Sequence, residues 1–269
     1  MIIGGHEFDV NNRTYIMGIL NVTQDSFSDG GKFNDIDRAL FQTEKMVKEG
    51  AHIIDVGGES TRPGYIPVSA EQEIDRVIPV ISKIKSEFNI PISIDTQKAI
   101  VAKAGVEAKV DIINDIWGLK GDPDMASVIA NSGVHCVLMH NRKEMNYVNY
   151  LDDVYTDLSQ TLEIANRAGI DENRIILDPG VGFAKNTEQN LEIMAHVDKL
   201  RLLGCPVLLA ASRKSVIGNT LGLPVDDRVE GTLALTALAV QKKCAFVRVH
   251  DVKENKRVID MLEAVYNYG

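Results

Sequence analysis

The chain of 269 residues is 45% hydrophobic and 25% charged, so it can bury a large core, and no Pro/Ser-rich or charge-block linker interrupts it. We therefore expect one domain spanning residues 1–269. The formal net charge of −9 argues against nucleic acid as a partner, because phosphate backbones attract a basic surface. The absence of a signal-peptide pattern and of any apolar run near about 18 residues predicts a cytoplasmic protein without a membrane partner.

The first dozen residues are predicted to form a short β-hairpin that covers the floor of the fold, with Asn11-Asn12 as its turn. Eight apolar runs follow, and each ends in polar residues, as expected of strands that emerge from a buried core. These runs cover residues 15–20, 52–55, 91–95, 111–115, 135–140, 175–178, 206–210 and 246–249.

Helical patterns separate the apolar runs. One begins at Asn34 or Asp35 and ends at Lys48, and the next begins at Ser69, which has capping-box spacing to Gln72. The others cover residues 96–108, 123–132, 151–168, 187–200, 227–243 and 253–266. This alternation predicts parallel strands joined by helices. Eight such units, with no GxGxxG after the first strand, favour a closed (β/α)8 TIM barrel over an open sheet.

In a (β/α)8 barrel the carboxyl ends of all strands face one pocket. The polar residues expected to meet there are Asn21, Asp55, Asp95, Asn114, Asp178, Lys214 and Arg248. Carboxylates and an amide can recognise a flat heterocycle with adjacent N–H donors. A single Asp at a strand end could equally cap the following turn, but several in different units favour a binding site.

The later units supply positive charge. Arg248 and His250 alternate along the last strand and point to the same side, where they could receive an anionic leaving group, although His250 could equally make a structural hydrogen bond. Lys214 could form a Schiff base only if its pKa is lowered. Asn21 offers an oxygen suited to Mg2+. The six histidines show no zinc-site spacing, and Cys136, Cys205 and Cys244 are expected to be buried thiols rather than ligands.

Eight motifs carry a resemblance to a known family over essentially the whole chain. They are MGILNVTQDSFSDGGKF, IIDVGGESTRPG, ISIDT, IINDIWG, CVLMH, ILDPGVGFAK, LLAASRKS and VRVHDV. In number, order and spacing these resemble the dihydropteroate synthases. The resemblance implies a pterin-binding barrel that joins 6-hydroxymethyl-7,8-dihydropterin diphosphate to p-aminobenzoate, with Mg2+ as cofactor, giving 7,8-dihydropteroate and diphosphate. It also implies a homodimer.

The resemblance assigns residues to three subsites. Those implied for the pterin ring are Asp95, Asn114, Ile116, Met139, Asp178 and Lys214. Those implied for the diphosphate are Asn21, through Mg2+, and Asp55, Thr61, Arg62, Arg248 and His250. Those implied for p-aminobenzoate are Phe27, Pro63, Phe183, Ser212 and Lys214. The residues expected to act in catalysis are Asn21, Asp95, Lys214, Arg248 and His250.

Two departures from the family pattern stand out. Gln24 replaces a proline in the first loop, which leaves p-aminobenzoate or sulfonamide affinity open. The run NRKEMNY after His140 is unusual, and we expect it to lie outside the main contacts. The alternatives are a methyltetrahydrofolate methyltransferase, a pterin-binding paralogue without synthase activity, and an unrelated barrel such as an aldolase using Lys214.

Overall fold

Eight parallel strands form the centre of the computed structural model, which describes residues 1–22, 32–59, 67–266 and 268. Their bounds are β3 Tyr15–Asn21, β4 Ile53–Gly57, β5 Ile92–Asp95, β6 Ile112–Asp115, β7 His135–Met139, β8 Ile175–Asp178, β9 Leu208–Leu209 and β10 Phe246–Val249. They pair in the order β8-β7-β6-β5-β4-β3-β10-β9, and a parallel bridge between Leu177 and Val207 joins the two ends. The predicted closed (β/α)8 barrel is thereby confirmed.

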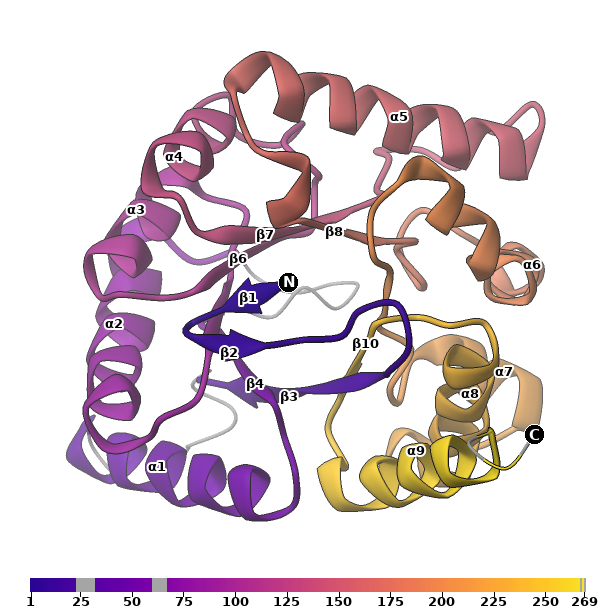
Figure 1. Cartoon of the computed structure of the whole chain (residues 1–269). Coiled ribbons are helices and arrows are strands. Elements are labelled where there is room, and N and C mark those ends of the chain that lie inside the picture. The colour runs from indigo at the N-terminus through magenta and orange to yellow at the C-terminus, as the bar shows by residue number, and fades with distance from the viewer. Residues whose placement is uncertain (23–31, 60–66, 267, 269) are drawn as a thin grey trace.

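Helices surround the strands on the outside of the barrel (Figure 1). Their bounds are α1 Lys32–Lys48, α2 Ala70–Glu87, α3 Ala99–Glu107, α4 Met125–Ser132, α5 Tyr150–Ala168, α6 Thr187–Ala195, α7 Ser215–Leu221, α8 Val229–Gln241 and α9 Val252–Tyr266. Short 3-10 turns lie at η2 Glu172–Arg174, η3 Val197–Leu203 and η4 Val225–Asp227. No helix within the described ranges has both the length and the apolar character of a membrane span.

Several predicted helix boundaries differ from the structure, for example 96–108 against the observed Ala99–Glu107 and 227–243 against Val229–Gln241. The helix expected over residues 187–200 breaks at His196, where φ is −114° and ψ is 17°, and continues as the 3-10 turn η3. That position has neither glycine nor proline to signal an end. The first helix begins at Lys32, so Asp35 lies within its first turn, where a negative charge is favourable. The predicted capping box is confirmed, because Ser69 and Gln72 bond each other reciprocally.

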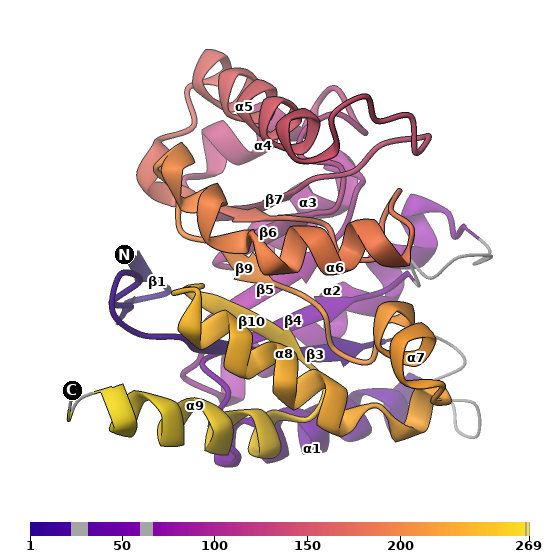
Figure 2. The same ribbon diagram turned by 90° about the vertical axis from the view of Figure 1, so that its right-hand side faces the viewer.

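A short antiparallel hairpin, β1 (Ile2–Ile3) and β2 (His6–Glu7), covers the floor of the barrel (Figures 1 and 2). Its turn is Gly4-Gly5, with φ of +55° and +81°. Asn11-Asn12 do lie in a turn, but this turn joins the hairpin to β3 and does not close the hairpin, as had been expected. Two-residue hairpin turns favour positive φ at both positions, which glycine adopts without strain. The following Phe8 packs against Phe246 inside the barrel, with the ring centroids 5.8 Å apart.

The strands alternate between the barrel interior and the surrounding helices. One apolar cluster lies inside the barrel near the floor, and a larger one fills the space between strands and helices. Residues of the inner cluster include Ile53, Ile112, Val137, Ile176 and Phe246. Two positions later on the same strands stand Asp55, Asn114, Met139, Asp178 and Arg248. The alternation that builds the floor therefore also directs these side chains toward the mouth.

The three cysteines are buried and free, as expected. Burial raises the pKa of the Cys244 thiol to about 12 and that of Cys205 to about 11, so both thiols stay protonated near neutral pH. They contribute to packing rather than to chemistry.

Candidate active site

Arg248 joins two carboxylates at the mouth of the barrel. Its Nε lies 2.6 Å from Asp55 Oδ2 and its Nη2 lies 2.6 Å from Asp95 Oδ2. Asn114 Nδ2 donates to the same Asp55 oxygen at 3.3 Å. These residues come from β4, β5, β6 and β10, so strand register alone brings together side chains up to 193 positions apart. The structure therefore brings together four of the predicted residues.

Burial governs the electrostatics of this cluster. The Asp55 side chain has no exposed surface and that of Asp95 is 11% exposed. Burial raises the pKa of Asp95 to about 7, while the Arg248 guanidinium opposes the rise. Burial alone would lower the pKa of Arg248, but the adjacent Asp55 and Asp95 carboxylates raise it instead. Arg248 is thus a permanent cation, and Asp95 gains or loses its proton near neutral pH.

Asp178 and Lys214 form a second charged group beside the first. Asp178 ends β8, and its Oδ1 accepts a bond of 2.7 Å from the Gly180 backbone N–H. Burial raises the pKa of this carboxyl group, and Lys214 opposes the rise. Lys214 stands directly before α7, and its Nζ donates to the Val181 carbonyl at 2.5 Å.

Lys214 is a half-buried cation that faces both groups of carboxylates. Burial lowers its pKa to about 8, while Asp178 and Asp95 act in the opposite direction. Its Nζ lies 5.0 Å from the centroid of the Phe183 ring, within cation–π range. At pH 7 the ammonium form therefore predominates, and it can donate to a ring carbonyl or a carboxylate of a ligand.

The remaining described candidates also lie at strand ends. Ile116, just after β6, and Met139, at the end of β7, are buried apolar residues that can pack on a flat ring. Ser212 is buried, and its Oγ lies 3.0 Å from His250 Nδ1 and accepts a 3.2 Å bond from the His250 N–H. This contact links the residue implied for p-aminobenzoate to one implied for the diphosphate.

The oxygen atoms near Asn21 fit a hard cation. A Cβ placed on Gly57 would lie 3.8 Å from Asn21 Oδ1 and 3.7 Å from Asp95 Oδ2, so both oxygens face the same glycine. Among the described residues, Asp55 Oδ1 is buried without a hydrogen-bond partner. No group of three or more His, Cys, Asp or Glu side chains in the described ranges could hold a metal. These donors suit Mg2+ that keeps waters and binds phosphate, rather than a closed protein cage.

Five residues named in the sequence analysis lie outside the described residues. They are Gln24, Phe27, Thr61, Arg62 and Pro63. Their assignments rest on the sequence resemblance.

Sequence reasoning missed a buried polar network around His140. His140 contacts Asp157 and Lys185, and two residues of the run 141–147, expected to lie outside the main substrate contacts, join this network. Arg142 Nε bonds Asp157 Oδ2 at 2.5 Å, and the Tyr147 hydroxyl donates to the Ala184 carbonyl at 2.9 Å. The sequence could have indicated this contact, because β7 and β8 are neighbouring strands, so residues just after their ends lie close together.

Comparison with known proteins identifies the family of the chain. The model of the pterin-binding enzyme family matches residues 17–250. A dihydropteroate synthase of Clostridium beijerinckii is 55% identical over 98% of this chain and 99% of its own length. The crystal structure of dihydropteroate synthase from Clostridium difficile, determined in the presence of pteroic acid, is 48% identical, with a TM-score of 0.94 over 97% of this chain and 99% of that one. That of Xanthomonas albilineans with 4-aminobenzoic acid is 39% identical, with a TM-score of 0.91 over 95% and 94%. The chain belongs to the dihydropteroate synthases, transferases of folate biosynthesis within the pterin-binding enzyme family.

Proposed function

We propose that the strand-end pocket performs the synthase reaction as a dissociative, S_N1-like displacement on 6-hydroxymethyl-7,8-dihydropterin diphosphate. The observation that carries the proposal is the placement of Arg248 between Asp55 and Asp95, beside Asp178 and Lys214, at one end of the barrel. The site thus places carboxylates, which stabilise a cationic pterin, next to cationic side chains, which stabilise the leaving diphosphate.

The pterin ring is bound at its polar edge. Asp178 accepts from the exocyclic amino and ring N–H groups, and its carboxylate is already oriented by the Gly180 N–H. Asn114 and Asp95 complete the edge, and Lys214 donates to the ring carbonyl and N5. Ile116 and Met139 pack on the ring. Because Asp178, Asn114 and Asp95 stand at strand ends, this subsite is set by the barrel itself.

The diphosphate leaves toward Arg248 and His250, with Asn21, Asp55, Thr61 and Arg62 completing its subsite. The described residues of that subsite fit a bound Mg2+, which would neutralise the phosphate oxygens, with Asn21 as its protein ligand. Arg248 supplies a fixed positive charge where negative charge grows on the bridging oxygen. One donor placed at a developing charge contributes about 3–4 kcal/mol in other enzymes.

The bond changes follow from the weak nucleophilicity of an arylamine. The C–O bond breaks first, and its electron pair leaves with the diphosphate. The dihydropterin ring spreads the resulting positive charge, which Asp95 and Asp178 stabilise from nearby. The neutral amine of p-aminobenzoate then attacks the carbon, and the new C–N centre loses one proton to water. A neutral aniline nitrogen needs no general base for the attack.

The p-aminobenzoate subsite lies on the turns after β8 and β9. Phe183 and Lys214 provide a ring surface and a cation, and Ser212 lies at the start of the turn before α7. Phe27 and Pro63 complete the subsite. The Xanthomonas albilineans enzyme crystallised with 4-aminobenzoic acid supports this choice of nucleophile.

We further infer a homodimer in a reducing, cytoplasmic setting. Leu221 and Val225 expose 53% and 41% of their surface on adjoining segments, α7 and η4, and such apolar side chains suit a covered interface. The free cysteines fit a reducing compartment. Sedimentation velocity of the purified chain tests the oligomer, and a single species at the monomer mass would remove that inference.

The test of the mechanism compares turnover with ring binding. Protein, Mg2+, dihydropterin diphosphate and p-aminobenzoate should yield dihydropteroate and diphosphate. Arg248→Met should lower kcat by about 100-fold or more, while the affinity for a dihydropterin without the diphosphate changes far less. Arg174→Met, a control at the barrel floor where Arg174 bonds the carbonyls of Ile129 and Val134, should leave kcat near the wild-type value. Equal losses of turnover and ring affinity in Arg248→Met would contradict the leaving-group role.

A further inference from the structure

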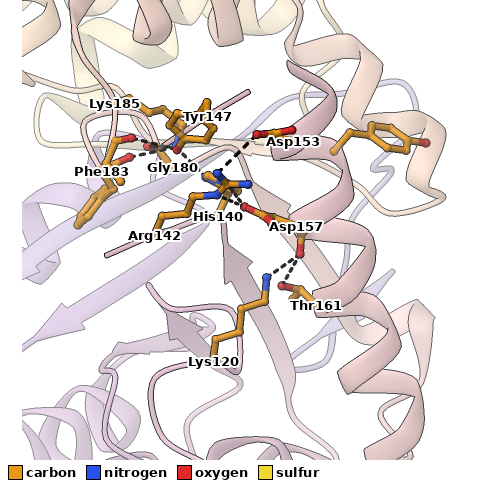
Figure 3. A network of polar contacts seen from close by, with 12 residues as sticks. Lys120, His140, Arg142, Tyr147, Asp153, Asp157, Thr161, Gly180, Phe183 and Lys185 are labelled. Carbon is orange, nitrogen blue, oxygen red and sulfur yellow. Dashed lines mark hydrogen bonds and ion pairs between the residues drawn. The ribbon is translucent and has the colours of Figure 1, made fainter. Parts of the chain in front are cut away.

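A chain of buried polar contacts lies behind the active site, on the side of α5 (Figure 3). Lys185 Nζ is 2.8 Å from His140 Nδ1, and His140 Nε2 is 3.0 Å from Asp157 Oδ2. The His140 side chain has no exposed surface, and Lys185 is 8% exposed. Burying a lysine is unfavourable unless its donors are satisfied, so this arrangement needs an explanation.

The direction of each hydrogen bond follows from the donor inventory. The ionised Asp157 carboxylate can only accept, so the neutral His140 ring must donate to it from Nε2 and accept from Lys185 at Nδ1. The His140 ring then carries its proton on Nε2 and donates to Asp157. Burial lowers the pKa of His140 to about 4, which keeps the ring neutral near pH 7. Although burial opposes it, hydrogen bonds from His140 and Arg142 hold the pKa of Asp157 below its ordinary value.

The other two donors of Lys185 bind the turn after β8. They reach the Gly180 carbonyl at 3.0 Å and the Phe183 carbonyl at 3.1 Å, so one ammonium group closes the turn on itself and ties it to the end of β7. The turn leaves little freedom at Gly180, where φ is +71° and a Cβ would lie 1.9 Å from the His140 carbonyl oxygen. Gly182, with φ of +84°, donates to Asn190 at 2.6 Å.

The same turn carries Val181 and Phe183, which lie beside the proposed p-aminobenzoate subsite. The Val181 carbonyl accepts from Lys214, and the Phe183 ring lies under the Lys214 ammonium. Neither group is on a strand, so the barrel does not fix their positions directly. Asp178, by contrast, is fixed by β8 and by the bond of 2.9 Å from the His140 N–H to the Asp178 carbonyl.

We propose that Asp157, His140 and Lys185 are positioning residues of the synthase: they hold the turn from Gly180 to Phe183 so that Phe183 and Lys214 are set for p-aminobenzoate. The inference rests on the p-aminobenzoate subsite proposed above. Asp157 orients the His140 ring, His140 directs one donor of Lys185, and Lys185 holds both ends of the turn. Tyr147, bonded to the Ala184 carbonyl from the adjacent loop, supports the same segment.

The experiment compares Lys185→Met with Lys120→Met. Lys120 donates at 2.7 Å to the Asp157 backbone carbonyl, so its removal takes a cation from the same network without touching the turn. Lys185→Met should raise KM for p-aminobenzoate about tenfold or more, because at least two hydrogen bonds that close the turn are lost. The dissociation constant of a dihydropterin, measured by calorimetry without p-aminobenzoate, should change less than about threefold, because Asp95, Asn114 and Asp178 stand on strands. Of that subsite, Lys214 contacts the turn at the Val181 carbonyl and Asp178 contacts it at the Gly180 N–H. Lys120→Met should match the wild type in both quantities.

A second variant separates positioning from general loss of structure. His140→Asn keeps an acceptor near the Nδ1 position and loses the contact with Asp157, so it should raise KM for p-aminobenzoate less than His140→Leu does. If Lys185→Met does not fold, this pair decides the question. Equal KM values for Asn and Leu, or equal losses of p-aminobenzoate and dihydropterin affinity, would overturn the inference. A wild-type protein that makes no dihydropteroate in the same assay would instead defeat the proposed function.

Discussion

Removing Arg248 should destabilise the protein by an amount that depends on pH. In Arg248→Met, two carboxylates that each lie 2.6 Å from the guanidinium lose their counter-charge, and one of them, Asp55, has no exposed surface. Asn114, bonded to Asp55 at 3.3 Å, is then a remaining neutral donor. Breaking a buried ion pair by deleting one partner costs about 3–5 kcal/mol of unfolding free energy, and we expect a loss in this range at pH 8.5.

The sign of the pH dependence follows from Asp95. Its folded pKa is raised to about 7, above the value of about 3.9 for an unfolded chain, so its contribution to stability is present at low pH and is lost as pH rises through 7. Without Arg248, which opposes this rise, the folded pKa moves higher still. At pH 5.5 Asp95 is protonated and does not need a counter-charge, so the loss should shrink by about 1 kcal/mol or more.

Urea unfolding of the wild type and of Arg248→Met at pH 5.5 and 8.5 measures these differences. Arg228→Met serves as the control, because its guanidinium bonds the backbone carbonyls of Arg213 and Leu223 and should give the same loss at both values. If Arg248→Met lost the same free energy at pH 5.5 as at pH 8.5, the coupling between Asp95 and Arg248 would be refuted. A loss below about 1 kcal/mol at both values would show that the pair is not effectively buried.

Three further outcomes are expected. Asp178→Asn places an amide donor against ring N–H groups and should weaken dihydropterin binding more than tenfold by calorimetry; unchanged affinity would remove Asp178 from the ring subsite. Gly180→Ala should lower unfolding free energy by more than about 3 kcal/mol, whereas Gly133→Ala, with a similar φ of +74° and open space around it, should lose only about 1–2 kcal/mol. Burial lowers the folded pKa of Lys185 to about 7, so the stability of the wild type should rise relative to Lys185→Met by on the order of 2 kcal/mol between pH 7 and 9; parallel pH curves would show that Lys185 titrates normally.

Many residues at the mouth of the barrel could be predicted from the alternation of side chains along the strands. The last strand reads Phe246, Arg248 and His250 on one side, and the structure places Phe246 in the floor cluster and Arg248 against two carboxylates at the mouth. The ends of β5 and β6 predicted Asp95 and Asn114 as neighbours, and their backbones do pair. The position of each of these residues follows from its place on its own strand and from the convergence of all strand ends on one pocket.

Other features depend on local backbone geometry that periodicity does not encode. The floor hairpin turns at Gly4-Gly5 because both positions have positive φ, although an Asn-Asn pair later in the chain looked like a plausible turn. The predicted helix over residues 187–200 breaks at His196 without a glycine or proline to mark the break. Such details are decided by a few dihedral angles, and the hydrophobic pattern is the same for either outcome.

The network around Lys185 is set neither by strand alternation nor by local backbone geometry, and this explains why sequence reasoning missed it. His140, just after β7, is 17 positions from Asp157 on α5 and 45 from Lys185 in the loop before α6, and none of the three follows a recognised ligand spacing. Their meeting requires that β7 pair with β8 and that α5 pack over both ends. Strands fix Asp95, Asn114, Met139 and Asp178, which are proposed for the pterin, whereas Phe183 and Ser212, described residues proposed for p-aminobenzoate, lie in turns or loops. A barrel that binds two substrates side by side therefore needs added support at the turns, and a buried ammonium with three acceptors supplies it from behind the site.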